Sequence, residues 1–145
     1  LVMRRSWLAR LRMTKEEVRR DHRDAEGDPM MRAARRRAYQ DLLTQATIAS
    51  VRSATVVVVN PTHLACALRY DEKGGDDAPV VVASGEGDLA AHIARAAREW
   101  GIPVVRDVPL ARALVELEAG TAIPEALYEA VAEILRDLAE EERRR

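Results

Sequence analysis

The tetrapeptide Asn60-Pro61-Thr62-His63 is the stretch whose residue types and spacing suit a covalent reaction. Breakdown at Asn ordinarily begins when the nitrogen of the next residue attacks the side-chain amide, but the nitrogen of Pro61 carries no hydrogen. The reverse attack remains open, in which the Asn60 side-chain nitrogen closes on its own backbone carbonyl and expels the Pro61 nitrogen. This reaction would cut the backbone, leaving a C-terminal succinimide on Asn60 and a free amino terminus on Pro61.

The rate of such a reaction depends on how firmly the local structure holds the amide nitrogen near the carbonyl carbon. Thr62 and His63 are close enough in sequence to hydrogen-bond the loop or to move a proton. An alternative needs no chemistry, because most Asn-Pro pairs are simply turns. The four residues by themselves leave both interpretations open.

A hydrophobic strand leads directly into this tetrapeptide. Val56 to Val59 are four consecutive valines, followed by the turn dipeptide Asn60-Pro61. Because β-branched side chains pack well on a pleated sheet, this run predicts a strand buried on both faces. The turn is therefore expected at the end of a core strand.

The sequence around the tetrapeptide resembles a known family. Asn60-Pro61-Thr62-His63 with residues 64–71 is similar to the cytoplasmic domain of the type III secretion switch proteins, the FlhB/SctU (YscU-like) family of flagella and injectisomes. The likeness extends over nearly the whole chain, through residues 13–18, 26–29, 78–85, 101–105, 109–114 and 123–132. It departs at the Gly/Asp-rich residues 71–77, and the family's membrane segments are absent.

The resemblance implies an export-apparatus protein that cuts itself once between Asn60 and Pro61, rather than an enzyme that turns over other molecules. In the family this cut accompanies a change of export specificity from early rod, hook or needle subunits to later filament or translocator substrates. The implied site residues are Asn60, Pro61, Thr62 and His63, with no cofactor. The implied partners are the other cytoplasmic domain of the export gate, a ruler protein and secreted substrates. The implied location is the cytoplasmic face of the bacterial inner membrane, in which the full-length protein is embedded.

A second hypothesis comes from a different functional class. A non-catalytic docking module would use an uncut Asn-Pro-Thr-His loop as a recognition surface for secretion partners. Fragments ending at Asn60 and starting at Pro61 would favour self-cleavage, whereas a chain that stays intact would favour docking.

Composition and length predict one domain and an arm. The chain has 145 residues, of which 32% are charged and 48% hydrophobic, as in globular proteins. A first residue of Leu1 rather than Met suggests a piece of a longer protein. Cys66 is the single cysteine, so it cannot form a disulfide within the chain and is expected to be buried. His22 and His92 have no partners at metal-ligand spacing, so we expect no metal site.

Charge divides the chain just before the valine strand. Residues 1–53 contain 13 Lys and Arg against 7 Asp and Glu, whereas residues 54–145 contain 10 against 17. The boundary predicts a basic helical arm over residues 1–53 and a compact domain over residues 54–145. The basic start suits an anionic lipid surface or, equally on its residues alone, a solvated and frayed helix end. The resemblance favours the lipid surface, because it implies a position directly after the last membrane segment. Nucleic-acid binding is disfavoured, because the arm lacks interleaved aromatic residues and Gly-rich loops.

Capping residues predict two helices in the arm. Thr14 and Glu17 form a capping box for a helix from about Lys15 to Gly27. Asp28 then caps a second helix, with Pro29 in its first turn, that runs to about Ser50. The apolar stripe of this second helix is thin, comprising Leu42, Ala46 and Ala49.

The predicted fold class is α/β, with a four-stranded mixed sheet packed with helices and preceded by the basic helical arm. After the valine strand, further strands are expected at residues 65–70, 79–83 and 104–105. One helix should open at Gly85 to Ala90, with Asp88 as its cap, and close at Gly101. Others should begin at Pro109, ending at Gly120, and at Pro124.

A dinucleotide-binding fingerprint is the strongest rival pattern. Gly85, Gly87 and Ala90 are spaced as in that motif, and Asp107 follows about 20 residues later. Charge opposes this interpretation, because Glu86 and Asp88 would occupy the helix start where a pyrophosphate must bind. Four strand candidates are also too few for a doubly wound sheet.

Overall fold

The computed structural model describes residues 15, 17, 19, 20, 28–61 and 63–145, and these fall into two units that divide between Leu42 and Leu43. The predictions for the basic start, for the Thr14 cap and for the helix end at Gly27 lie outside the described residues. The boundary predicted between residues 53 and 54 stays a prediction.

Helix α2 (Pro29–Ser50) begins as its capping residues predict. The Met30 N–H donates to Asp28 Oδ1 at 3.1 Å, and the Arg32 N–H donates to the Asp28 backbone oxygen at 3.0 Å. No residue of α2 is buried, and Leu42 is 64% exposed. The thin apolar stripe is therefore present as predicted, but none of it packs into a core.

The second unit contains a four-stranded mixed sheet in the order β3-β2-β1-β4, which confirms the predicted fold class. Its strands are β1 (Val56–Asn60), β2 (Leu64–Arg69), β3 (Val80–Glu86) and β4 (Val104–Arg106). β1 pairs antiparallel with β2 and parallel with β4, and β2 pairs antiparallel with β3. The valine strand is thus central, and Val56 to Val58 have no exposed surface.

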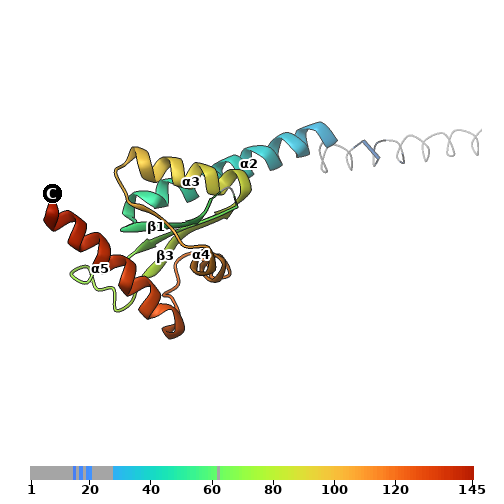
Figure 1. Cartoon of the computed structure of the whole chain (residues 1–145). Helices are drawn as coiled ribbons and strands as arrows, with labels where there is room; N and C mark the ends of the chain where they lie inside the picture. The colour runs from blue at the N-terminus through green and yellow to red at the C-terminus, as the bar shows by residue number, and fades with distance from the viewer. Residues whose placement is uncertain (1–14, 16, 18, 21–27, 62) are drawn as a thin grey trace, which may run out of the picture. The chain divides into compact units, whose positions relative to one another are not determined.

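Alternate residues of β1 belong to two separate hydrophobic cores, because successive side chains of a strand point to opposite faces of the sheet. Val57 and Val59 pack with Ala65 and Ala67 against α3 (Gly87–Glu99). Val56 and Val58 belong to the opposite cluster, which includes residues of α4 (Val108–Val115) and α5 (Tyr128–Arg144). Figure 1 shows α3 on one face of the sheet and α4 with α5 on the other.

Short elements complete the unit. The 3₁₀ turn η1 (Val51–Ser53) precedes β1, and η2 (Glu125–Leu127) precedes α5. The Asp107 side chain caps α4 by accepting the Leu110 N–H at 3.1 Å. Gly101 follows α3 with φ of +71°, as the predicted helix stop requires.

Three details of the sequence prediction are wrong. β3 continues through Gly85 to Glu86, so the helix starts at Gly87, because Gly85 and Glu86 pair with Ala65 and Leu64. Asp88 lies inside the first turn of α3, and the capping position belongs to Glu86.

The third error concerns Gly120, which does not end the helix that begins near Pro109. α4 ends at Val115. Gly120, with φ of +91°, instead donates its N–H to the Val81 backbone oxygen at 2.6 Å. The segment after α4 therefore binds the free edge of β3.

Candidate functional site

Asn60 is the last residue of β1 and the first of a tight turn into β2. The strands are in register up to the pair Asn60 and Leu64. The His63 N–H donates to the Asn60 backbone oxygen at 3.0 Å, which closes a four-residue turn. Pro61 takes the second position, which its fixed φ suits. Thr62 lies outside the described residues.

The far side of the turn is bound to the start of α3. The His63 backbone oxygen accepts the N–H of Gly87 at 3.0 Å. His63 therefore uses both of its backbone groups, one toward Asn60 and one toward α3. Its side chain is exposed.

The strand before the turn is held on its other edge by β4. The Val57 N–H donates to the Pro103 oxygen at 2.9 Å, and the Asp107 N–H donates to the Val59 oxygen at 3.1 Å. Since Asp107 also caps α4, the residue before Asn60 is fixed to the sheet and to a helix start. The Asn60 backbone is thus fixed on one side, while its side chain is half-buried at the surface.

This arrangement suits an attack on the Asn60 carbonyl. A hydrogen bond from the His63 N–H polarises the carbonyl and points at the atom on which negative charge would develop. The nucleophile would be the side-chain nitrogen of the same residue, so no second molecule has to be brought to the site. Of the predicted site residues, the structure brings Asn60, Pro61 and His63 together in one turn.

A hollow of about 330 Å³ lies between this turn and α3. Its apolar lining includes Val59, Leu64 and Ala94, and Arg95 and Arg98 are its basic residues. Asn60 and Pro61 also line it. The bond between Asn60 and Pro61 therefore borders an open space rather than the packed core.

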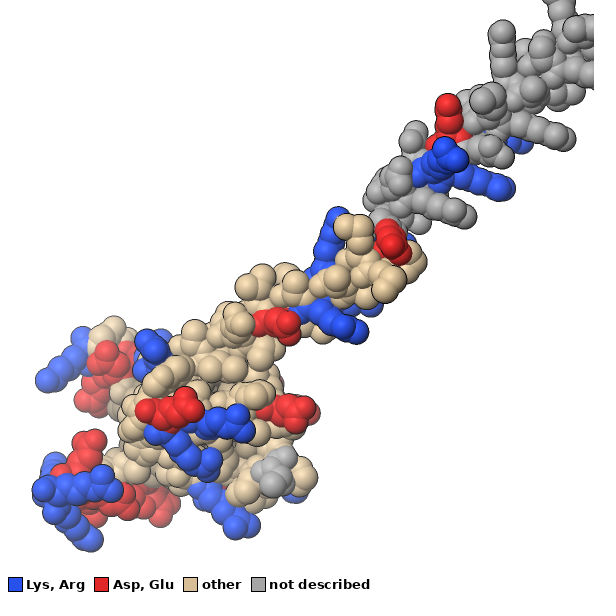
Figure 2. Space-filling model, turned by 90° about the horizontal axis from the view of Figure 1, so that it is seen from above, with Lys and Arg blue, Asp and Glu red and all other residues tan. Residues whose placement is uncertain are grey.

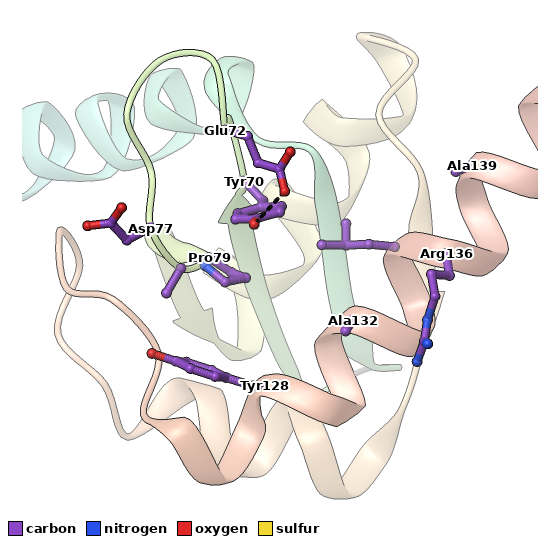
Figure 3. A pocket seen from close by; sticks show the side chains of 10 residues that line it. Tyr70, Glu72, Asp77, Pro79, Tyr128, Ala132, Arg136 and Ala139 are labelled. Atoms are coloured by element: carbon purple, nitrogen blue, oxygen red, sulfur yellow. Dashed lines mark hydrogen bonds between the residues drawn. The ribbon is translucent and has the colours of Figure 1, made fainter.

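A second hollow, of about 420 Å³, was not predicted from the sequence. Figure 3 shows Tyr70 and Pro79 on one side of it and Ala132 and Arg136 of α5 on the other. The Tyr70 hydroxyl donates to Glu72 Oε1 at 2.8 Å, and this hydrogen bond raises the pKa of Tyr70. Two of the five aromatic residues of the chain, Tyr70 and Tyr128, line this hollow. Because aromatic residues are scarce in this sequence, these two were the signal that could have indicated the hollow.

The rival dinucleotide site does not fit this geometry. Gly85 is paired in β3, where a Cβ would lie 2.5 Å from Leu89 Cγ. The Gly87 N–H already binds His63, and the Asp107 carboxylate already caps α4. The groups that would hold a pyrophosphate and a ribose thus have partners within the chain.

The described residues also bear on other classes of site. In that part of the chain, no three His, Cys, Asp or Glu side chains are grouped to hold a metal ion. None of its helices has the length and apolar character needed to cross a bilayer. Figure 2 shows acidic and basic side chains interspersed over the displayed face of the compact unit. That face has no basic patch of the kind that binds nucleic acid.

Comparisons with known proteins agree with the fold. A sequence model described as the FlhB HrpN YscU SpaS family matches residues 1–138. The flagellar biosynthetic protein FlhB of Yersinia enterocolitica is 43% identical over 90% of this chain and 34% of its own length. The hypersensitivity response secretion protein HrcU of Ralstonia nicotianae is 42% identical over 86% of this chain and 35% of its own length. The chain therefore spans about a third of these relatives.

A solved structure shares the architecture. The crystal structure of the cytoplasmic domain of FlhB from Shewanella putrefaciens matches with a TM-score of 0.61 and 41% sequence identity. The match covers 64% of this chain and 71% of that chain. The likeness therefore extends from the sequence to the fold.

Proposed function

This chain belongs to the FlhB HrpN YscU SpaS family, and from that premise we propose that it is the cytoplasmic domain of an export-apparatus protein that cuts itself between Asn60 and Pro61. The cut is a single event within each molecule. It changes which substrates a type III secretion apparatus, flagellar or injectisome, exports.

One observation carries the proposal, the 3.0 Å hydrogen bond from the His63 N–H to the Asn60 carbonyl. The carbonyl that accepts this bond is the one that the Asn60 side chain must attack. The donor is in place before the reaction and needs no rearrangement, which is how oxyanion-type stabilisation lowers a barrier. Removing one such donor from an enzyme typically slows its reaction by about 10²–10³-fold.

The reaction balances within the chain. The Asn60 Nδ2 forms a bond to the Asn60 carbonyl carbon, and the bond from that carbon to the Pro61 nitrogen breaks. The proton lost from Nδ2 ends on the Pro61 nitrogen, which becomes the new amino terminus. Water then opens the succinimide in a separate step. The exposed His63 side chain and Thr62 are the proposed groups for proton movement.

The switch follows from what remains fixed after the cut. The His63 oxygen stays bound to Gly87, and β2 stays paired from Leu64 onward. Pro61 is no longer bonded to Asn60 and becomes an amino terminus, whose reference pKa is about 8. A partner that reads this loop meets a new shape and a new positive charge without a change in the core.

The proposed partners are the other cytoplasmic domain of the export gate, a ruler protein and the secreted substrates. The full-length protein would be embedded in the bacterial inner membrane, with this domain on the cytoplasmic face. The basic arm over residues 1–53 would lie near anionic lipid.

A docking role for the uncut loop is the second candidate. It is favoured by the exposure of Pro61 and His63 beside the hollow that Arg95 and Arg98 help to line. In that case the loop would be a recognition surface, and no fragment would form.

The experiment follows the purified chain at mild alkaline pH on denaturing gels, with protease inhibitors present. Self-cleavage gives two fragments with first-order kinetics that do not depend on protein concentration. A chain that stays whole throughout would refute self-cleavage and support docking.

For the switch, backbone NMR shifts of the cut chain and of uncut Asn60→Ala should differ only around residues 58–66. Differences spread through α3, α4 and α5 would contradict a local switch.

A further inference from the structure

We propose that Gly87 is a positioning residue for the self-cleavage, acting through the backbone of His63. Gly87 holds the His63 carbonyl, and this contact keeps the His63 N–H on the carbonyl of Asn60. The inference rests on the proposed self-cleavage and adds a residue from α3 to it.

Two hydrogen bonds in series connect Gly87 to the reacting carbonyl. The Gly87 N–H donates to the His63 oxygen at 3.0 Å, and the His63 N–H donates to the Asn60 oxygen at 3.0 Å. His63 is therefore held at both of its backbone groups. Loss of the first bond would let the His63 backbone rotate, which would move the second donor away from Asn60.

Strand register brings Gly87 to this position. β2 and β3 pair up to Leu64 and Glu86, so the next residues outward are His63 and Gly87. The contact lies at the end of the β2–β3 ladder, where the chain leaves the sheet to form α3. The register of a strand remote in sequence thus controls the geometry of the turn.

Glycine is needed here for its backbone conformation. Gly87 has φ of +57°, which L side chains rarely adopt, whereas a Cβ at this position would meet nothing within 4 Å. A substitution would therefore act through strain and not through a clash. The first N–H groups of a helix have no partner within the helix, and the Glu86 side chain does not cap α3. The Gly87 N–H is thus free of the helix ladder and directed at the turn.

The test compares three variants that differ in one respect each. Gly87→Ala places a β-carbon on a residue with positive φ and disfavours that conformation. Gly87→Asn keeps the N–H and tolerates positive φ far better. Gly101→Ala is the matched control, because Gly101 has φ of +71°, has nothing within 4 Å of its Cβ position and lies at the opposite end of α3.

The first readout is the first-order rate of cutting on denaturing gels. A misplacement of about 1 Å can slow a positioned reaction by roughly 10²-fold, so we expect Gly87→Ala to be slower than wild type by at least about tenfold. We expect Gly87→Asn to recover most of the rate, and Gly101→Ala to cut at the wild-type rate despite a similar loss of stability. Equal rates for Gly87→Ala and Gly101→Ala would overturn the inference, as would a Gly87→Asn variant as slow as Gly87→Ala.

The second readout does not need the cut. In the Asn60→Ala background, hydrogen exchange of the His63 amide should be faster with Gly87→Ala than with Gly101→Ala. Unchanged exchange would overturn the connection between Gly87 and the turn even if wild type cuts. Failure of wild type to cut would instead refute the proposed function and, with it, the role of Gly87 in positioning the reaction, while the exchange result would still report on the contact.

Discussion

Strand β2 connects at its two ends to loops of opposite character. The turn Asn60–His63 is closed by backbone hydrogen bonds, from His63 to Asn60 and from Gly87 to His63. The loop between β2 and β3 has a backbone bond from the Asp76 N–H to the Asp71 oxygen at 3.0 Å, but it depends on side chains as well. Arg69 binds the Asp76 carboxylate through Nε at 2.9 Å and Nη2 at 3.1 Å. That carboxylate also accepts the Asp71 N–H at 2.9 Å.

The two loops should therefore respond differently to pH. Backbone bonds do not titrate, so the first turn keeps its geometry over a wide pH range. The hydrogen bond from Arg69 holds the pKa of Asp76 below its usual value. Because the folded pKa is lowered, the stabilisation is present above the unfolded pKa and disappears as the pH falls through the folded value. The second loop should therefore loosen in acid before the first.

The largest expected effect comes from removing the nucleophile at the first turn. Asn60→Ala should abolish cutting completely, because no side-chain amide remains to close on the carbonyl. Asn60→Asp should cut far more slowly at neutral pH. Both variants should keep the fold, since Asn60 is half-buried at a strand end and not in the core. The measurement is the fraction of cut chain on denaturing gels, with circular dichroism as the control; cutting in Asn60→Ala would rule out the succinimide route.

The cut at the first turn should leave the two fragments bound to each other. β1 ends in one fragment and pairs with β2 and β4 of the other, with Val56 to Val58 fully buried. Separation would expose these valines at a cost of roughly 1.5–3 kcal/mol each. Native size-exclusion chromatography should give one peak that contains both fragments. Two separate peaks without denaturant would contradict the central position of β1.

An intermediate effect is expected at Cys66, on the strand between the two loops. Burial raises the pKa of its thiol from 9.0 to about 12. Between these values the unfolded chain loses the proton and the folded chain keeps it, so stability should fall as the pH rises, by up to about 1.4 kcal/mol per pH unit. Urea unfolding at several alkaline pH values should show a shallower fall for Cys66→Ala than for wild type. Parallel curves would mean that the thiol ionises as readily in the fold as outside it.

The smallest effect should come from the second loop. Asp76→Asn removes the ion pair with Arg69 and should flatten the acid side of the stability profile. The change at neutral pH should be small, because the Arg69 side chain is 37% exposed and solvent screens the pair. Cutting at Asn60 should proceed at the wild-type rate. A slower cut in this variant would show that the two loops are coupled through β2.

The sequence predicted most of this sheet from local patterns. Four valines before an Asn-Pro pair specified the central strand, and Pro109 marked a helix start, whereas the capping role of Asp107 was not predicted. β3 was predicted too short, because Gly85 and Glu86 are poor strand residues that remain in the strand only through their pairing with Ala65 and Leu64. Gly120 follows a helical pattern, yet its partner is Val81 on β3. Both errors arise from contacts between segments far apart in the sequence.

Of the candidate site, the turn was predictable from the sequence, and its reaction stays a prediction. The spacing of Asn60, Pro61, Thr62 and His63 predicts the bond that could react, because the proposed chemistry lies within neighbouring residues. The contact with Gly87 depends on the register of β2 against β3, which no local pattern encodes. The glycine pattern at residues 85–90 instead suggested a nucleotide motif, and only the folded chain shows which group each amide binds.

Intact-mass spectrometry of freshly cut wild-type chain tests self-cleavage most directly. Cyclisation of Asn60 consumes no water, so the masses of residues 1–60 and 61–145 should add up to the mass of the uncut chain, until the succinimide opens and the first fragment gains one water. Both fragments should end and begin at the bond between Asn60 and Pro61. A chain that stays intact, a cut at another bond, or fragments that carry an added water from the first time point would contradict the account.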